Sequence, residues 1–139
     1  MKKGSGIINI ASVAAYQPIP YINVYGATKS FVLNFTRALS MELRPKGIRV
    51  MAVCPFWTKT EFFDRAVKNE ADPVVKKYVA MYDPKDIVRR ALSDYKKGKD
   101  VSLFGFVTKL QLLGVKLMPA GMTMRVWMSQ QKLWKRENK

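Results

Sequence analysis

The 139-residue chain contains no histidine and a single cysteine, Cys54. A site in which histidine and cysteine side chains bind zinc or another transition metal is therefore excluded, and no disulfide can form within the chain. Cys54 closes the apolar run 50–54, which is a typical setting for a buried thiol. We therefore predict a structural rather than a reactive cysteine.

Acidic residues are scarce as well, with 10 aspartates and glutamates against 25 lysines and arginines, and the formal net charge is +15 at pH 7. Many nucleic-acid-binding proteins are this basic. The cations here, however, are scattered along the chain, with neither zinc-finger spacing nor an RNP-type aromatic motif. We therefore predict that the chain does not bind nucleic acid.

The amino terminus lacks the uninterrupted apolar core of a secretory signal peptide. Two lysines precede an apolar stretch, as in a signal peptide, but Asn9 and Ser12 interrupt that stretch. We therefore reject secretion and expect a cytoplasmic protein, with association at a membrane surface left open.

Segments typical of strands alternate with segments typical of helices, and this order predicts an α/β fold with a parallel sheet. We predict strands at 6–11, 48–53 and 101–104, long helices at 23–43 and 85–97, and short helices within 55–72 and around 73–81. Along the first long helix, apolar residues recur at helical spacing, at Ala27, Phe31, Phe35, Ala38 and Leu39.

Tyr25 and Lys29 are four residues apart on the predicted helix 23–43, so their side chains share one face. An ammonium beside a phenol favours the phenolate and lowers the phenol pKa from its usual value near ~10. Such a tyrosine can exchange a proton with an alcohol or a ketone near neutral pH. Ser12 follows the first strand, and open α/β sheets bind ligands at the carboxyl ends of their strands. The three residues are therefore candidate catalytic residues.

This arrangement resembles the short-chain dehydrogenase/reductase family, in which a strand ending in serine precedes Tyr-x-x-x-Lys at the start of a long helix. Here the motif reads Gly6-Ile-Ile-Asn-Ile-Ala-Ser12, then Tyr25-Gly-Ala-Thr-Lys29. Further matches follow in order: Leu39-Ser-Met-Glu42, Gly47-Ile-Arg-Val50, Val53-Cys-Pro55 and Thr60. The resemblance covers essentially the whole chain. It implies the second half of a Rossmann-like, doubly wound parallel sheet with about three strands.

The resemblance also implies a role for each of the three candidate catalytic residues. Tyr25 is expected to exchange a proton with the substrate oxygen, and Ser12 to donate a hydrogen bond to that oxygen. Lys29 is expected to hold the nicotinamide ribose and to lower the pKa of the tyrosine. The implied activity is hydride transfer between NAD or NADP, with NADP slightly preferred, and a ketone or secondary alcohol of lipid-like character.

Cofactor contacts are expected from Tyr25, from Lys29 and from the loop after the second strand. The loop residues concerned are Pro55, Phe56, Thr58 and Thr60. Phe56 stands where the family usually has a glycine, and its side chain is expected to narrow the nicotinamide pocket. No metal is expected in the site.

The chain has neither a Gly-x-x-x-Gly-x-Gly nor a Gly-x-Gly-x-x-Gly turn for the dinucleotide pyrophosphate. Family members are longer and carry that turn before the serine-bearing strand. We therefore expect this chain to be a carboxyl-terminal fragment that is inactive in isolation. The alternative is a non-catalytic product that acts only through interactions or at a membrane surface.

Residues 106–139 extend beyond the usual family pattern and predict two basic amphipathic helices, broken at Pro119-Ala-Gly121. Neither reaches the ~20 uninterrupted apolar residues that a membrane span needs. We therefore divide the chain into a Rossmann half, 1–105, and a helical extension, 106–139. The extension either packs as a lid or subunit contact or lies on a membrane surface. The family often dimerises through the helix that bears the tyrosine, so a homo-oligomer is expected.

Each candidate residue also has a simpler structural explanation. Tyr25 and Lys29 fit an ordinary amphipathic helix, Ser12 fits the cap of a turn, and Thr60 fits a helix N-cap. Three aromatic residues flank the expected substrate side and fit either a pocket lining or ordinary packing: Tyr16, Tyr21 and Trp57.

Overall fold

The computed structural model describes residues 1–67 and 73–136. Its strands are β1 (Gly6–Ile10), β2 (Arg49–Val53) and β3 (Val101–Ser102). Its α-helices are α1 (Asn23–Leu43), α2 (Phe62–Val67), α3 (Pro84–Lys96), α4 (Phe106–Leu117) and α5 (Ala120–Gln130). Short 3-10 helices occupy Val13–Tyr16, Arg44–Lys46 and Leu133–Arg136.

The three strands form one parallel sheet in the order β1-β2-β3. Ile7 pairs with Val50 in the first ladder, and Val53 pairs with Ser102 in the second. Parallel neighbours need a crossover connection, and α1 supplies it between β1 and β2, as α3 does between β2 and β3. The alternation of strand and helix in the sequence therefore predicted the sheet correctly.

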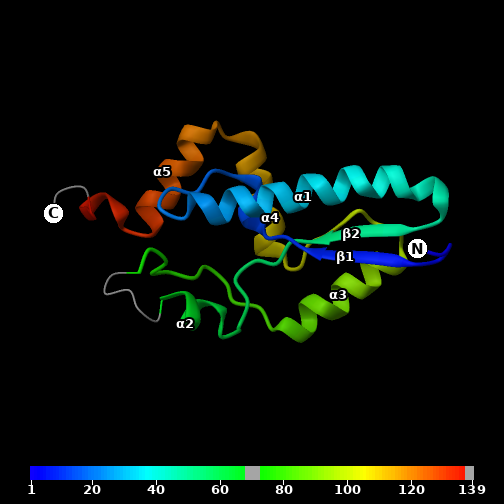
Figure 1. The fold of residues 1–139 in the computed structure, drawn as a ribbon. Helices are drawn as coiled ribbons and strands as arrows, with labels where there is room; N and C mark the ends of the chain where they lie inside the picture. Colours follow the sequence, from blue (N-terminus) through cyan, green and yellow to red (C-terminus); the bar gives the residue numbers. More distant parts are fainter. Residues whose placement is uncertain (68–72, 137–139) are drawn as a thin grey trace.

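Helices cover both faces of the sheet, and β2 shows why. Ala52 packs with Leu33 of α1, whereas the adjacent Met51 packs with Ile87 of α3. Successive side chains of a strand point to opposite faces, so a central strand buried on both faces must be apolar throughout. Figure 1 shows α1 and α3 on opposite sides of the strands. The chain thus has the doubly wound, Rossmann-like arrangement that was predicted.

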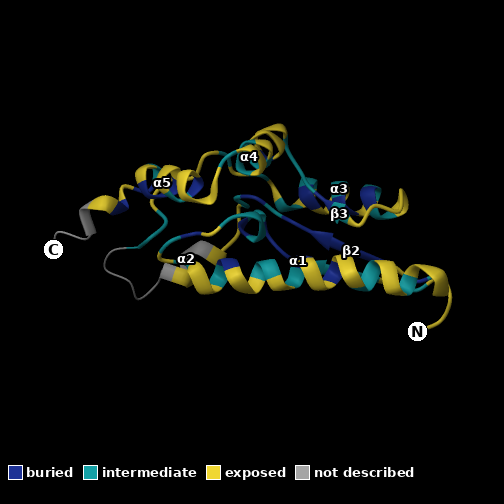
Figure 2. Ribbon diagram, turned by 90° about the horizontal axis from the view of Figure 1, so that it is seen from above, coloured by how far each residue is buried: buried dark blue, intermediate teal, exposed yellow. Residues whose placement is uncertain are grey.

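Helix α1 runs over the predicted residues, but its aromatic stripe points away from the sheet. Phe31 and Phe35 are 69% and 50% exposed, and their rings stack with centroids 5.9 Å apart. The buried face instead consists of Gly26, Leu33 and Thr36. Figure 2 shows the outer side of α1 as exposed along its length. The regular apolar spacing therefore marks a free helix face rather than the core-facing one.

The helix predicted around residues 73–81 is wrong, because the structure has no helix there. Tyr82 instead pairs with Thr58 in an isolated parallel bridge, and its N–H donates to the Trp57 carbonyl at 2.9 Å. Val74 and Val75 pack against a buried cluster that contains Trp127. These long-range contacts replace the local hydrogen bonds that a helix would have made.

The carboxyl-terminal extension forms the two predicted helices, α4 and α5, with the break at Pro119. The second helix ends at Gln130, earlier than expected. Lys132 then adopts a left-handed conformation with φ of 56°. This bend returns Leu133 to the interior, where it is fully buried. Among the described residues, no helix is both long enough and apolar enough to cross a membrane.

A buried carboxylate joins α3 to β3. The Asp94 side chain is only 2% exposed and lies 2.9 Å from Arg90 Nε and 2.8 Å from Lys99 Nζ, while the Ser102 hydroxyl donates to it at 2.9 Å. Burial by itself raises the pKa of Asp94, but the bonds from Lys99, Arg90 and Ser102 outweigh burial and hold that pKa below its ordinary value.

We expect Asp94→Asn to lower the free energy of unfolding by about 2 kcal/mol at pH 7, since charged hydrogen bonds are lost. The folded carboxyl binds fewer protons than the unfolded one, so its contribution is present above about pH 4 and is lost as pH falls through the lower folded pKa. The difference between the two proteins should therefore shrink in acid. Urea unfolding at several pH values measures this difference in the free energy of unfolding.

The control is Asp100→Asn. Asp100 belongs to an ion pair whose side chains are about half exposed, so this substitution should change the free energy of unfolding by less than about 1 kcal/mol. Equal effects of both substitutions would contradict the assignment.

Candidate functional site

A cavity of about 470 Å³ lies at the carboxyl ends of β1 and β2. Its walls come from the segments after these two strands, from the first turns of α1, from α2, and from the extension through α4 and α5. The predicted site residues all line it: Ser12, Tyr25, Lys29, Pro55, Phe56, Thr58 and Thr60. The fold thus brings together groups separated by up to 48 positions, from Ser12 to Thr60.

Ser12 follows β1 and caps the 3-10 helix Val13–Tyr16, since its Oγ accepts a hydrogen bond from the Ala14 N–H at 3.1 Å. The structural explanation and the catalytic one are therefore compatible. The bond from Ala14 occupies a lone pair of the hydroxyl and leaves its proton available as a donor. Because Ser12 is 8% exposed and lines the cavity, its donor is available to a ligand there.

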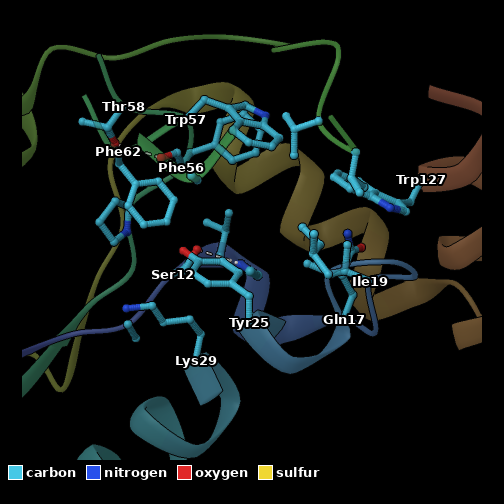
Figure 3. Close-up of a pocket in the computed structure, with 18 of the residues that line it drawn as sticks. Ser12, Gln17, Ile19, Tyr25, Lys29, Phe56, Trp57, Thr58, Phe62 and Trp127 are labelled. Carbon is cyan, nitrogen blue, oxygen red and sulfur yellow. Dashed lines mark hydrogen bonds between the residues drawn. The ribbon is translucent and has the colours of Figure 1, made fainter. Parts of the chain in front are cut away.

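Tyr25 and Lys29 stand one turn apart on α1, as the spacing predicted. The Lys29 Nζ lies 5.7 Å from the centroid of the Tyr25 ring and donates to the Ile10 carbonyl at 3.0 Å. The Tyr25 ring packs at 5.9 Å from Phe62 of α2. In Figure 3 the Tyr25 side chain points up into the cavity, beside Ser12 and above Lys29. The ammonium is thus anchored at the end of β1, next to the phenol.

The loop after β2 forms the opposite wall. The Thr58 hydroxyl donates to the Phe56 carbonyl at 2.9 Å, and the Thr60 hydroxyl accepts from the Phe62 N–H at 3.4 Å. Phe56 is 9% exposed, and its ring packs against Trp57 and Tyr82. The phenylalanine therefore forms part of this wall of the cavity.

Of the three flanking aromatic residues, Tyr21 and Trp57 line the cavity and Tyr16 does not. Tyr16 packs instead against the buried cluster that includes Cys54. Cys54 is 1% exposed, and burial raises the pKa of its thiol to about 11. The prediction of a buried, structural cysteine is therefore confirmed.

Sequence reasoning missed several residues of the cavity. Trp127 and Gln111 reach it from the extension, while Ile19, Val74 and Val75 reach it from loops. The one available signal was the tryptophan within an amphipathic tail, which is equally typical of a membrane-surface helix. Only the packing of the extension distinguishes a tryptophan that lines the cavity from one in a membrane-surface helix.

The cavity has two chemically different halves. One half presents a hydroxyl, a phenol and an ammonium, from Ser12, Tyr25 and Lys29. Elsewhere the lining consists mainly of aliphatic and aromatic side chains. Among the described residues that line the cavity, Lys29 is the single charged one. This arrangement suits proton exchange with a polar atom carried on a largely apolar molecule.

The chain is similar to proteins of known family. Residues 1–71 match the family model described as short chain dehydrogenase. The glucose and ribitol dehydrogenase homolog 2 of Arabidopsis thaliana is 45% identical over 74 residues, which make up 50% of this chain and 26% of that protein. The chain thus spans far less than the full length of this relative.

Solved structures show the same relationship. A short-chain dehydrogenase from Sphingobium yanoikuyae in complex with NADPH is 30% identical with a TM-score of 0.60, over 78% of this chain and 41% of that one. The 3-ketoacyl-(acyl-carrier-protein) reductase of Brucella melitensis, complexed with NADH, is 32% identical with a TM-score of 0.51, over 64% of this chain and 36% of that one. Because the family model covers residues 1–71 of 139 and the fold agrees, the chain belongs to the short-chain dehydrogenase family of oxidoreductases.

Proposed function

We propose that this chain carries the catalytic half of an NAD(P)-dependent oxidoreductase that interconverts a ketone and a secondary alcohol. The observation that supports the proposal best is the meeting of Ser12, Tyr25 and Lys29 in one cavity at the carboxyl ends of the strands. A serine hydroxyl, a phenol and an ammonium together provide a hydrogen-bond donor, a proton donor and a positive charge for one reacting oxygen.

The chain's own residues act on that oxygen. Ser12 donates a hydrogen bond to it and stabilises negative charge as the carbonyl carbon is reduced. The Tyr25 phenol transfers its proton to the same oxygen, and the reverse transfer serves alcohol oxidation. Lys29, held by the Ile10 carbonyl at 3.0 Å, places its charge beside the phenol.

The residues present fit the nicotinamide end of a dinucleotide. Lys29 offers a cation to ribose hydroxyls, and the loop from Pro55 to Thr60 offers hydroxyls on the facing wall. When bound, the cofactor supplies or accepts the hydride. The two solved relatives are complexes with NADPH and with NADH. We propose NAD or NADP, with a slight preference for NADP.

We also propose that the chain has two functional segments and forms a homo-oligomer. Residues 1–105 serve as the catalytic half and 106–139 as an extension over the cavity. The exposed Phe31–Phe35 stripe of α1 supports a homo-oligomer formed through this helix. A contact of the extension with a membrane surface is the less favoured proposal, because Trp127 and Leu133 are buried within the chain.

The test compares two proteins. By itself the 139-residue chain should not oxidise NADPH or NADH, because its sequence lacks a glycine-rich turn for the pyrophosphate. A chimera that joins it to the amino-terminal half of the Sphingobium relative should oxidise NADPH in the presence of ketones.

Absorbance at 340 nm, which reports the reduced nicotinamide, measures both rates, and circular dichroism controls for folding. A folded chimera that binds NADPH but turns over no ketone or secondary alcohol would contradict the proposal. That outcome would favour the alternative, a chain that acts only through interactions.

A further inference from the structure

The extension lines the cavity on the side away from Lys29. Trp127 of α5 is 6% exposed and lines the cavity, although it lies about a hundred positions from the catalytic residues. Figure 3 shows Lys29 and Trp127 at opposite ends of the view, with Ser12 and Tyr25 between them. A substrate whose oxygen reaches Ser12 and Tyr25 must therefore direct its remaining atoms toward this wall.

Two contacts fix the orientation of Trp127. Its Nε1–H donates to the Pro20 carbonyl at 3.1 Å, in the loop before α1. Its ring lies nearly parallel to Trp57, with an interplanar angle of 16° and centroids 6.5 Å apart. The two indoles thus lie next to each other with nearly parallel rings, and this contact joins the extension to the loop after β2.

Gln131, at the end of α5, ties a second segment to this wall. The side chain is fully buried, and its Oε1 accepts from the N–H groups of Lys76 and Lys77 at 2.7 and 2.9 Å. Its Nε2 donates to the Lys77 carbonyl at 2.9 Å. One amide thus serves three backbone groups of a segment that has no regular structure of its own. The same segment contributes Val74 and Val75 to the cavity lining.

The end of the cavity near Trp127 favours uncharged substrate groups over charged ones. Its surface includes Ile19 and Trp127, together with the uncharged amide of Gln17, which Figure 3 shows beside Ile19. A carboxylate or phosphate placed there would lose its hydration without gaining a cation, because Lys29, at the other end, is the single charged residue among the described residues of the lining. A flat apolar group, by contrast, gains contact with the indoles.

We propose that the extension is the specificity-determining wall of this site, with Trp127 as the contact residue and Gln131 as the residue that positions the 74–77 segment. The substrate class is a ketone or secondary alcohol that carries an uncharged, bulky aromatic or fused-ring group. This inference rests on the proposed function for the reacting end of the substrate, whereas the wall itself is tested by binding alone.

The test measures binding to the 139-residue chain without cofactor. Isothermal titration calorimetry is carried out with 2-acetylnaphthalene, with 6-acetyl-2-naphthoic acid, which adds a carboxylate to the same ring system, and with 2-butanone. The uncharged naphthyl ketone should bind at least about tenfold more tightly than either of the others. Trp127→Ala should weaken its binding by roughly tenfold or more.

The chain offers matched controls. Trp134→Ala removes a tryptophan of the extension that is 50% exposed and lies outside the cavity lining, and should leave the affinity within about twofold. Gln131→Ala should weaken binding about fivefold through loss of a preorganised wall, whereas Gln130→Ala should not. Trp127→Phe serves if Trp127→Ala fails to fold, and should give a smaller loss of affinity than the alanine.

The outcomes separate the two proposals. Binding that depends on Trp127, in a chain whose chimera has no reductase activity, supports the wall and contradicts the proposed function. The proposal that the extension determines specificity is overturned if the three ligands bind with equal affinity. It is also overturned if the wild-type chain and both Trp127 variants bind the naphthyl ketone with equal affinity. In an active chimera, a merely structural role would lower thermal stability without changing the ratio of kcat/KM for the naphthyl ketone and 2-butanone. A Trp127 variant that leaves this ratio unchanged also overturns the proposal.

Discussion

Tyr25→Phe should lower the kcat of the active chimera about a thousandfold, within the range of about 10² to 10⁴ that general acid–base catalysis contributes. The substitution removes only the phenolic oxygen. The ring keeps its packing against Phe62 and its position one turn from Lys29. The proton that the substrate oxygen needs must then come from water, whereas the cavity keeps its shape.

Cofactor affinity separates this role from a structural one. Binding of NADPH, followed by protein fluorescence, should change little in Tyr25→Phe, because Lys29 and the Pro55–Thr60 loop remain. Tyr95→Phe is the matched control: it removes a hydroxyl beside Gly6, at the opposite end of β1. Its kcat should stay within about twofold of the wild type. Near-normal turnover by Tyr25→Phe would remove this residue from the proposed chemistry.

Gly105→Ala should lower the free energy of unfolding by roughly 4 kcal/mol, and two effects combine to produce the loss. Gly105 joins β3 to α4 with φ of 90° and ψ of 145°, a conformation that costs a residue with a side chain about 1–3 kcal/mol. An added Cβ would also overlap the Tyr82 ring, and overpacking of this kind costs about 1–3 kcal/mol. The ring has little room to move, since it packs at 5.1 Å from Phe104 and at 6.4 Å from Phe56.

Gly98→Ala isolates the backbone part of this effect. Gly98 also has a positive φ, of 72°, but no atom lies within 4 Å of a Cβ placed there. Its loss should be only about 1–2 kcal/mol. Urea unfolding followed by circular dichroism compares the two variants. If the two variants lose equal free energy of unfolding, the Tyr82 ring moves aside at no energetic cost, and the overlap does not contribute to the loss.

The sheet and the reacting half of the site were open to prediction because local patterns encode them. Apolar runs bounded by turn residues marked β1 and β2, and helical spacing marked α1 over its observed length. Tyr25 and Lys29 share a helix face through the helix period alone. Ser12 follows a strand, and parallel strands place their carboxyl ends at one edge.

The errors arose where distant contacts override local preference. Residues 73–81 look helical, but Gln131 supplies their backbone with hydrogen bonds from 54 and 55 positions away. Phe31 and Phe35 recur at helical spacing on the exposed side of α1, so periodicity located a face without showing which way it points. For Tyr16 the sequence left pocket lining and ordinary packing open, and the structure packs it against the cluster that contains Cys54.

By itself, the sequence determined the parallel α/β fold and the meeting of Ser12, Tyr25 and Lys29. The alternation of strands and helices along the chain and the period of a helix both follow from patterns among neighbouring residues. Only the tertiary structure decided that the basic, apolar extension turns Trp127 inward, where it lines the cavity. An amphipathic helix buries its apolar face against whatever surface lies within reach, and its sequence does not name that surface. Here the surface is the loop before α1 and the 74–77 segment, which the chain's own fold brings to the carboxyl ends of the strands.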